Sequence, residues 1–262
     1  MKIRLDQYMA DKGIAPSRSM ARAMIMGGEV YINGEKALKA GSFVTGDEKI
    51  EIKETMPYVS RGGYKLDKAL KVFPVSPKGR ICLDIGASTG GFTDCLLQNG
   101  ALKVYSVDVG YGQLDYKLRT DDRVICMERT NFRYCTPDDF PERPSFVSCD
   151  VSFISLALIF PPMAEIITDD GEAVCLIKPQ FEAGKGKTHK GVVTDPAIHR
   201  EAVLSAVSAA ENSGFGVMGL DFSPVKGPKG NIEFLLHLKK GAKSTEYSVD
   251  EIINNAHKEL CD

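Results

Sequence analysis

Along most of the chain, short hydrophobic runs alternate with longer amphipathic segments. The runs have the length and β-branched content of buried strands, and they read ICLDI, VYSVD, VICME, SFVSCD, AVCLIK, FGVMGLDF and IEFLLHLK. Helices are expected near residues 90–99, 154–167 and 196–212, and Asp195-Pro196 is a strong start signal for the last. This alternation predicts an α/β fold with a parallel, doubly wound sheet. The last two strands are joined by a loop without a helix, so they should form an antiparallel pair at one edge.

The first 54 residues follow a different pattern. Leu5, Tyr8 and Met9 indicate a short helix, and Ser17 is a good N-cap for a second one. Short strands follow as EVYI, SFV and KIEIK, separated by tight Asn-Gly and Gly-Asp turns. We therefore expect a small α+β domain over residues 1–54, a linker over 55–60 and a larger domain over 61–262.

The second helix of the small domain presents a hydrophobic face and a basic face. Arg18 and Arg22 lie one turn apart on the basic face, and the methionines expected in the small core are Met20, Met24 and Met26. Two such helices followed by GEVYING and GDEKIEI resemble the small RNA-binding domain named after ribosomal protein S-four. In that family the basic face touches RNA phosphates, so the resemblance makes Arg18 and Arg22 candidate RNA-binding residues. The alternative is that both arginines only solvate a helix.

A glycine-rich turn follows the first strand of the larger domain, in LDIGASTGGFTD, and Asp108 ends the next strand. This arrangement predicts a nucleoside-bearing cofactor at the carboxyl edge of the sheet, with its ribose hydroxyls on Asp108. The glycines are expected to let backbone and ligand approach closely. Their G-x-x-x-G spacing lacks the tight pyrophosphate cradle, and the acids Asp84 and Asp94 suit a ligand with a cationic centre and an amino group. S-adenosylmethionine is such a ligand. A glycine turn in some other α/β sheet is the alternative.

The candidate cofactor-binding residues come from this turn and from the ends of the neighbouring strands. Glu128 and Asn131 follow the third strand, near the place expected for adenine, although Glu128 could also be simply solvated. The full set is Asp84, Gly86, Ala87, Ser88, Gly90, Gly91, Phe92, Asp108, Glu128, Asn131 and Asp150.

Four charged residues are expected near the same edge. Asp150 and Lys178 end two strands, Glu233 lies inside the last predicted strand, and Lys65 lies in the first turn of an amphipathic helix. A charge in such a place is costly unless it is paired, and two lysines with two acids can neutralise one another. Ordinary surface ion pairs at strand ends are the alternative for each residue taken alone.

Lys-Asp-Lys-Glu in this order resembles the catalytic tetrad of FtsJ-type RNA ribose 2′-O-methyltransferases, whose seven-stranded sheet is Rossmann-like. SRGGYKL, DVSFISL and KPQFEAGK also resemble the TlyA family of ribosomal-RNA methyltransferases, some of which are labelled haemolysins. The resemblance implies S-adenosylmethionine-dependent methylation of cytidine ribose in large-subunit RNA and, for some members, small-subunit RNA. It implies Lys178 as the base, oriented by Asp150, with Lys65 and Glu233 as the supporting pair. Arg61, Lys187 and Lys190 are candidates for holding RNA phosphates, unless the loop after Lys178 is merely exposed.

The composition of the chain limits the partners that it can bind and the cellular compartment in which we expect it. The net charge is -2, so any nucleic acid must be met by a local basic patch. The seven cysteines show no C-x-x-C spacing, which predicts buried reduced thiols, and the four histidines predict no metal site. We expect no signal peptide and no membrane span, hence a cytoplasmic protein that acts on ribosomal RNA or ribosomal subunits.

Two other functions remain open at this point: a non-catalytic RNA-binding scaffold and a haemolysin-like membrane-active protein. DVSF stands where base and DNA methyltransferases carry an Asn-Pro-Pro-Tyr-like motif, which disfavours chemistry on a base amino group. The oligomeric state is not predicted.

Overall fold

The computed structural model describes residues 2–52, 57–184 and 187–261. The chain divides into two compact units, Met1–Pro57 and Tyr58–Asp262. Each is described by itself below.

A seven-stranded mixed sheet forms the centre of the second unit, with strand order β11-β12-β10-β9-β6-β7-β8. β12 is antiparallel to both β10 and β11, whereas β6 to β10 pair in parallel. This confirms the predicted mixed α/β sheet with an antiparallel pair at one edge. The strands are β6 (Ile81–Ile85), β7 (Lys103–Val107), β8 (Val124–Met127), β9 (Phe146–Cys149), β10 (Glu172–Ile177), β11 (Phe215–Phe222) and β12 (Phe234–Lys240).

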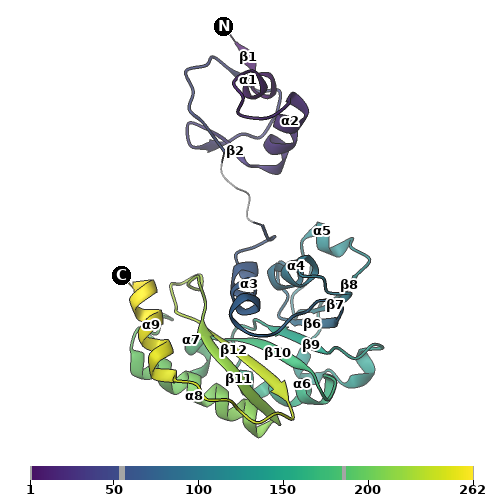
Figure 1. Ribbon diagram of the computed structural model, residues 1–262, viewed down its shortest axis with the longest axis vertical. Helices are drawn as coiled ribbons and strands as arrows, with labels where there is room; N and C mark the ends of the chain where they lie inside the picture. The colour runs from purple at the N-terminus through teal and green to yellow at the C-terminus, as the bar shows by residue number, and fades with distance from the viewer. Residues whose placement is uncertain (1, 53–56, 185–186, 262) are drawn as a thin grey trace. The chain divides into compact units, whose positions relative to one another are not determined.

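Helices cover both faces of this sheet, with α3 and α4 on one side and α6 and α8 on the other (Figure 1). The α-helices are α3 (Gly62–Val72), α4 (Gly91–Gln98), α5 (Tyr116–Arg119), α6 (Phe160–Ile166), α7 (Pro179–Glu182), α8 (Pro196–Asn212) and α9 (Val249–Cys261). Three short 3-10 turns, η1 (Phe132–Tyr134), η2 (Pro137–Asp139) and η3 (Leu156–Leu158), lie between them. The helix predicted over 154–167 is divided into η3 and α6. Pro161 and Pro162 explain the division, because they lack the N–H groups that a continuous helix needs and fit only its first turn.

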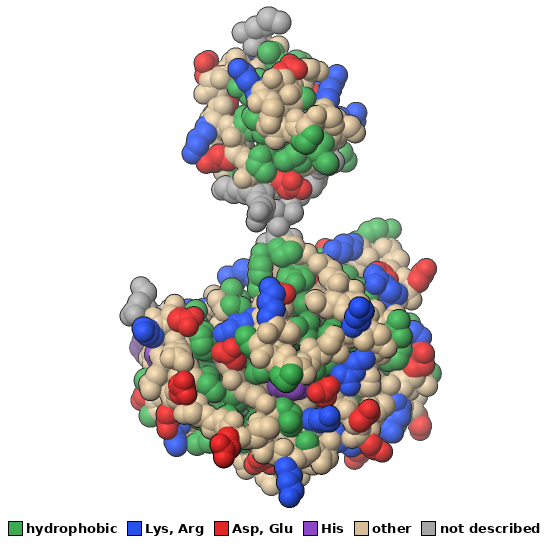
Figure 2. All heavy atoms as spheres, in the orientation of Figure 1, with side chains coloured by type: hydrophobic (Ala, Val, Ile, Leu, Met, Phe, Trp, Pro, Cys, Tyr) green, Lys and Arg blue, Asp and Glu red, His purple; other side chains and the backbone are tan. Residues whose placement is uncertain are grey.

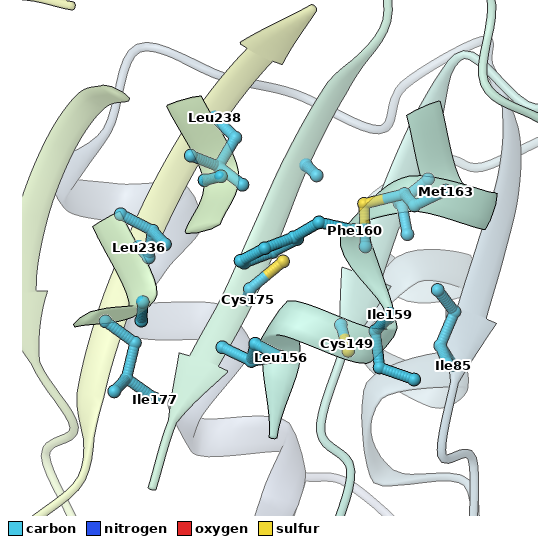
Figure 3. Packing of buried hydrophobic residues seen from close by; sticks show 14 of the residues in the cluster. Ile85, Cys149, Leu156, Ile159, Phe160, Met163, Cys175, Ile177, Leu236 and Leu238 are labelled. Atoms are coloured by element: carbon cyan, nitrogen blue, oxygen red, sulfur yellow. The ribbon is translucent and has the colours of Figure 1, made fainter. Parts of the chain in front are cut away.

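The larger hydrophobic core lies between the sheet and α6, α8 and α9. Figure 3 shows Phe160 of α6 lying across Cys175 of β10, beside Leu156 of η3. Along β6, Leu83 and Ile85 belong to this core, while Cys82 packs against the α3 and α4 side. The free thiols in the described part of the chain are Cys82, Cys95, Cys126, Cys135, Cys149 and Cys175, and all but Cys126 are buried, as the sequence predicted.

The first unit is a small α+β fold. Its helices are α1 (Leu5–Asp11) and α2 (Arg18–Gly27), and its strands are β1 (Ile3–Arg4), β2 (Val30–Ile32), β3 (Glu35–Lys36), β4 (Phe43–Val44) and β5 (Ile50–Ile52). The Met20 amide donates to the Ser17 hydroxyl, which caps α2 as expected, and Gly28 closes the helix in the left-handed region. Ala21 and Ile25 fill the core from one face of α2.

The methionines of α2 differ from the sequence prediction. Met20 is 50% exposed and Met26 is 80% exposed, and only the half-buried Met24 packs against the core. The inward stripe is set by Ala21 and Ile25, which are one turn apart. Met20 and Met26 each lie one residue, or about 100°, away from that stripe. The prediction of a buried methionine cluster was therefore wrong for two of its three members.

The second unit begins to pack at Tyr58, within the segment predicted as a linker over 55–60. Residues 55 and 56 lie outside the described part of the chain. The Tyr58 ring is buried, and an added Cβ on Gly63 would lie 2.2 Å from it. The Val59 amide donates to the Asp94 carboxylate over 2.9 Å. Residues 58–60 are therefore held against α3 and α4.

Candidate active site

Four charged side chains from distant parts of the sequence meet at the carboxyl edge of the sheet. Lys65 comes from α3, Asp150 and Lys178 directly follow β9 and β10, and Glu233 directly precedes β12. The Lys178 ammonium lies 2.6 Å from one oxygen of Asp150, whose other oxygen lies 3.5 Å from the Lys65 ammonium. Lys65 in turn donates to Glu233 over 2.6 Å. The charges thus alternate along one chain of contacts, which we call the tetrad: Lys178, Asp150, Lys65 and Glu233.

Three of these charged groups are buried, because Lys65, Lys178 and Glu233 are 7%, 8% and 1% exposed. Burial alone would lower the pKa of the Lys65 ammonium, but the carboxylates of Asp150 and Glu233 outweigh it and raise that pKa above its ordinary value. Lys65 therefore stays a cation. The Lys178 ammonium also donates to the Ser152 hydroxyl over 2.9 Å.

Glu233 stands just outside β12, although the sequence predicted it inside the last strand. The ladder between β10 and β12 starts with Phe234 opposite Ile177. Toward β11, the carbonyl of Glu233 accepts from the Ser223 amide over 2.8 Å, which extends the pairing of Phe222 with Phe234 by one residue. Glu233 is thus held at the end of the strand, and its carboxylate reaches Lys65.

A cavity of about 300 Å³ opens beside the tetrad, and we call it the tetrad cavity. Lys65, Asp150 and Lys178 line it directly, whereas Glu233 is covered by Lys65. Its other walls come from the turn after β6, the start of α3 and the loop between β11 and β12; they include Arg61, Ala87, Phe92, Lys226 and Gly227.

The glycine-rich turn after β6 is held by backbone hydrogen bonds. The amides of Gly86 and Ala87 both donate to the carbonyl of Val107, over 2.9 and 3.1 Å. The Ser88 amide donates to the Asp108 carboxylate over 2.7 Å, and Ser88 itself adopts φ +48°. The turn after β6 and the end of β7 therefore form one unit.

A second cavity of about 450 Å³ lies on the other side of this turn, and we call it the Asp108 cavity. One Asp108 oxygen accepts from Ser88 and the other from the Gly110 amide over 2.7 Å, but each keeps a further lone pair for a ligand. Asn131 and largely apolar side chains complete the walls, among them Val107, Val109, Phe132 and Ile154. Both cavities share Gly86, Ser88, Asp150 and Ser152, so they adjoin at these residues.

Known proteins share this sequence and architecture. Residues 58–240 match the FtsJ-like methyltransferase family, and residues 3–50 match the S4 domain. The chain belongs to the FtsJ-like methyltransferase family. The 16S/23S rRNA (cytidine-2′-O)-methyltransferase TlyA of Mycobacterium tuberculosis is 42% identical over 91% of this chain and 90% of its own length. Hemolysin A of Brachyspira hyodysenteriae is 45% identical over 90% of this chain and 99% of its own. A solved structure from Streptococcus thermophilus with a provisional hemolysin name matches with a TM-score of 0.78 and 48% identity, over 99% of this chain and 97% of its own.

The cofactor of this methyltransferase is S-adenosylmethionine, and the residues present fit it. The Asp108 cavity has the size of a nucleoside site, apolar walls for an adenine ring and a carboxylate that can accept from a ribose diol. Gly86, Ser88 and Asp150, which both cavities share, would flank the path from the adenosine toward the tetrad. When bound, the cofactor supplies an electrophilic methyl group.

Asp84, an expected cofactor-binding residue, lies away from both cavities. Its carboxyl group is fully buried and accepts from the hydroxyls of Thr93, over 2.7 Å, and Ser148, over 3.0 Å. Burial raises the pKa of Asp84 to about 7. Asp84 lines neither cavity, and it supports the site through its hydrogen bonds to Thr93 and Ser148.

Two other acids are also engaged elsewhere. Glu128 accepts from Arg119 over 2.6 Å and from the Gln113 amide over 3.1 Å, and it lines neither cavity. Asp94, the second acid expected to suit a cationic ligand, accepts from Val59 and pairs with Lys117. Their sequence positions suited a ligand, but nearby cations and amides of the chain take up both carboxylates.

The glycines of the turn also leave room for neighbouring parts of the chain. An added Cβ on Gly86 would lie 2.6 Å from the carbonyl oxygen of Asp150, and one on Gly90 would lie 2.2 Å from Leu118. One on Gly91 would lie 2.3 Å from the Ser60 hydroxyl. Gly86 and Gly91 line the tetrad cavity, whereas Gly90 lines neither cavity.

Phe153 is a site residue that the sequence reasoning missed. It is 90% exposed, adopts φ +64° and lines the Asp108 cavity. Its ring centroid lies 5.0 Å from that of Phe181, in the segment that follows Lys178. Neither packing nor an ordinary turn explains an exposed aromatic in a strained conformation. Its position three residues after Asp150 could have indicated a place in the site. However, Phe153 begins a hydrophobic run, and such a run suggests a core segment.

The candidate RNA-binding residues of the second unit differ in their surroundings. Arg61 is exposed at the start of α3 and lines the tetrad cavity. Lys190 is exposed with φ +51°, and Lys187 is paired with Glu201 of α8. Neither lysine lines either cavity, and residues 185 and 186 of the same loop lie outside the described residues.

In the first unit, Arg18 lies 3.3 Å from the buried carboxylate of Asp6, which also accepts from Arg4. Arg22 is exposed on α2. On the face shown in Figure 2, basic and acidic side chains are interspersed over both units, in keeping with a net charge of -2. Any RNA contact therefore depends on local groups of basic residues.

Within residues 2–52, 57–184 and 187–261, no group of three or more His, Cys, Asp or Glu side chains is arranged to hold a metal ion. In the same residues, no helix is long and apolar enough to cross a membrane.

Proposed function

We propose that this methyltransferase transfers a methyl group from S-adenosylmethionine to the 2′-hydroxyl of cytidine ribose in ribosomal RNA. The large-subunit RNA is the first expected substrate, and the small-subunit RNA is the second. The tetrad carries the proposal, because it places two lysines and two carboxylates beside the cavity that fits the cofactor. The relative from M. tuberculosis, named for the same reaction on 16S and 23S RNA, supports the choice of substrate.

A ribose hydroxyl is a weak nucleophile and must lose its proton as it attacks. We assign proton acceptance to Lys178, which must react as the neutral amine, because Lys65 is held as a cation between two carboxylates. Asp150 lies between the two lysine nitrogens and orients Lys178 over 2.6 Å. Lys65 and Glu233 then form the pair that fixes the hydroxyl. Much of the rate enhancement would come from this positioning.

The arrangement around Asp150 favours a ribose over a base amino group. Asp150 is ion-paired with two lysines, so the site offers the nitrogens of Lys65 and Lys178 to the hydroxyl oxygen that receives the methyl group. A base methyltransferase would present an amide and an aromatic side chain to an amino group at this position. DVSF stands there instead.

Three groups of residues would hold the RNA. Phe153 offers an exposed aromatic face beside the site on which a base can stack. Arg61 at the cavity wall, with Lys187 and Lys190 in the loop after α7, would contact phosphates. The small domain over residues 1–54 would use Arg18 and Arg22 in the same way, while residues 61–262 carry the chemistry and 55–60 join the two. We expect the enzyme to work in the cytoplasm, on ribosomal RNA or on assembled subunits.

The test is methyl transfer from radiolabelled S-adenosylmethionine to unmodified 16S and 23S RNA and to unmodified small and large subunits. Positions resistant to alkaline cleavage identify 2′-O-methylation. We expect one or a few cytidine riboses to be modified by the wild-type protein and by Lys243→Ala, whose lysine is exposed and lines neither cavity, and none by Lys178→Ala. Absence of transfer to every RNA by a protein that binds the cofactor would contradict the proposal and favour an RNA-binding scaffold.

A further inference from the structure

The loop between β11 and β12 forms one wall of the tetrad cavity, through Val225, Lys226, Gly227 and Pro228. It also lies directly against the tetrad: an added Cβ on Gly227 would be 2.4 Å from a carboxylate oxygen of Glu233. The position of this loop therefore bears on the position of Glu233, which in turn holds Lys65.

Asn231, two residues before Glu233, ties this loop to another segment. Its side chain is 2% exposed. The side-chain oxygen accepts from the Val193 amide over 2.9 Å, and the side-chain nitrogen donates to the Gly191 carbonyl over 2.9 Å. The backbone carbonyl of Asn231 accepts from the Gly227 amide over 2.9 Å. Asn231 thus links the loop between β11 and β12 to the Gly191–Val193 segment.

The Gly191–Val193 segment, to which the Asn231 side chain binds, is itself held by helices α8 and α9. His199 of α8 is buried, and its Nε2 lies 3.1 Å from the Val193 carbonyl oxygen. Because a carbonyl only accepts, Nε2 carries the proton of this hydrogen bond. Nδ1 of His199 then accepts from Nε2 of His257 on α9, over 2.9 Å. Val193 therefore gives Asn231 a rigid support.

We infer that Asn231 is a positioning residue for methyl transfer, because it holds the loop between β11 and β12 on the anchored Gly191–Val193 segment. It thereby sets the position of Glu233 and of the wall that this loop gives to the tetrad cavity. The inference rests on the proposed function. Asparagine suits the role because the two backbone groups require one acceptor and one donor from the same side chain. Aspartate would lack the donor for Gly191, and alanine would leave both buried groups without their partner.

The test compares Asn231→Ala and Asn231→Asp with the wild type under single-turnover conditions, with the proportion of folded protein fixed by cofactor-binding stoichiometry. We expect the rate of methyl transfer to fall about 10- to 100-fold, because a displaced loop between β11 and β12 misaligns the ribose hydroxyl. The dissociation constant for S-adenosylmethionine should change less than about twofold, because the Asp108 cavity stays intact. Asn99→Ala is the matched control, since it also removes an asparagine hydrogen bond to a carbonyl but lines neither cavity. Wild-type rates in both Asn231 variants, or losses that only follow the folded fraction, would overturn the inference.

Amide hydrogen exchange provides a readout that does not depend on activity. In Asn231→Ala, the amides of Val193 and Gly227 should both exchange faster, while amides in the middle of α8 keep their protection. Unchanged protection of Gly227 would show that the side chain does not couple the two segments. If the wild type transfers no methyl group, the proposed function fails, and the exchange result still decides the coupling by Asn231.

Discussion

The two cavities of the methyltransferase unit are built in different ways. The Asp108 cavity depends on a local turn, in which Ser88 and the carboxylate that receives its amide are 20 residues apart. The tetrad depends on side chains from four separate elements, and its Lys65–Glu233 hydrogen bond joins residues 168 positions apart. The first combines a hydrogen-bonded turn with largely apolar walls, and the second is built from charges that neutralise one another. A substitution should therefore affect cofactor binding or methyl transfer according to the cavity it touches.

The largest effect is expected at Lys178. Lys178→Met should lower the single-turnover rate of methyl transfer to RNA by about a thousandfold, because the proposed proton acceptor is removed. The rate is measured at saturating S-adenosylmethionine and RNA. Lys243→Met is the matched control, since Lys243 is an exposed lysine that lines neither cavity. Transfer by Lys178→Met within tenfold of wild type would rule out the assignment of the base.

Asp108 should show the opposite behaviour. Asp108→Ala removes the proposed ribose acceptor and the partner of the Ser88 and Gly110 amides, so cofactor affinity should fall about 10- to 100-fold. Calorimetric titration with S-adenosylmethionine gives the change. Glu128→Ala is the comparison, because Glu128 lines neither cavity and should alter the affinity by less than about threefold. Equal losses in the two variants would mean that Glu128 also holds the cofactor.

A smaller effect is expected from Gly227→Ala. The added Cβ would lie 2.4 Å from a Glu233 oxygen, so the carboxylate must move away from Lys65. We expect methyl transfer to fall about tenfold with little change in cofactor affinity, since the misplacement is confined to the acceptor side. Pro224→Ala serves as the control, because Pro224 is exposed in the same loop and lines neither cavity. A normal rate in Gly227→Ala would show that Glu233 tolerates displacement.

The smallest effect concerns stability and Asp84. Burial raises the pKa of Asp84 to about 7, whereas an unfolded aspartate titrates near pH 3.9. Between about pH 4 and pH 7 the folded state binds this proton more tightly than the unfolded state does, so the stability that Asp84 contributes falls as pH rises through this window. Asp84→Asn should remove that slope. Urea unfolding at several pH values measures it, and parallel curves for the two proteins would contradict the burial effect.

The comparison of the two cavities also explains what the sequence could predict. The glycine turn and Asp108 form a local pattern, and the alternation of runs predicted the sheet, because burial imposes a periodicity on neighbouring residues. Lys65 and Glu233 were expected near the same edge, but their grouping as a supporting pair came from resemblance to a family, since no local pattern records a contact across 168 positions. The partners of Asp84 and Glu128 inside the protein could not be predicted, because position along a strand does not show which neighbour donates to a carboxylate. Phe153 was missed because a hydrophobic residue suggests burial, whereas its backbone conformation exposes it.

The most direct test of the separation between the two cavities is the dissociation constant of S-adenosylmethionine for Lys178→Met, measured by calorimetry beside wild type and Asp108→Ala. The account predicts that Lys178→Met binds the cofactor like wild type, while Asp108→Ala binds it far more weakly. If Lys178→Met lost affinity as strongly as Asp108→Ala, the two cavities would be one cofactor site, and the role of Lys178 as the base would be contradicted.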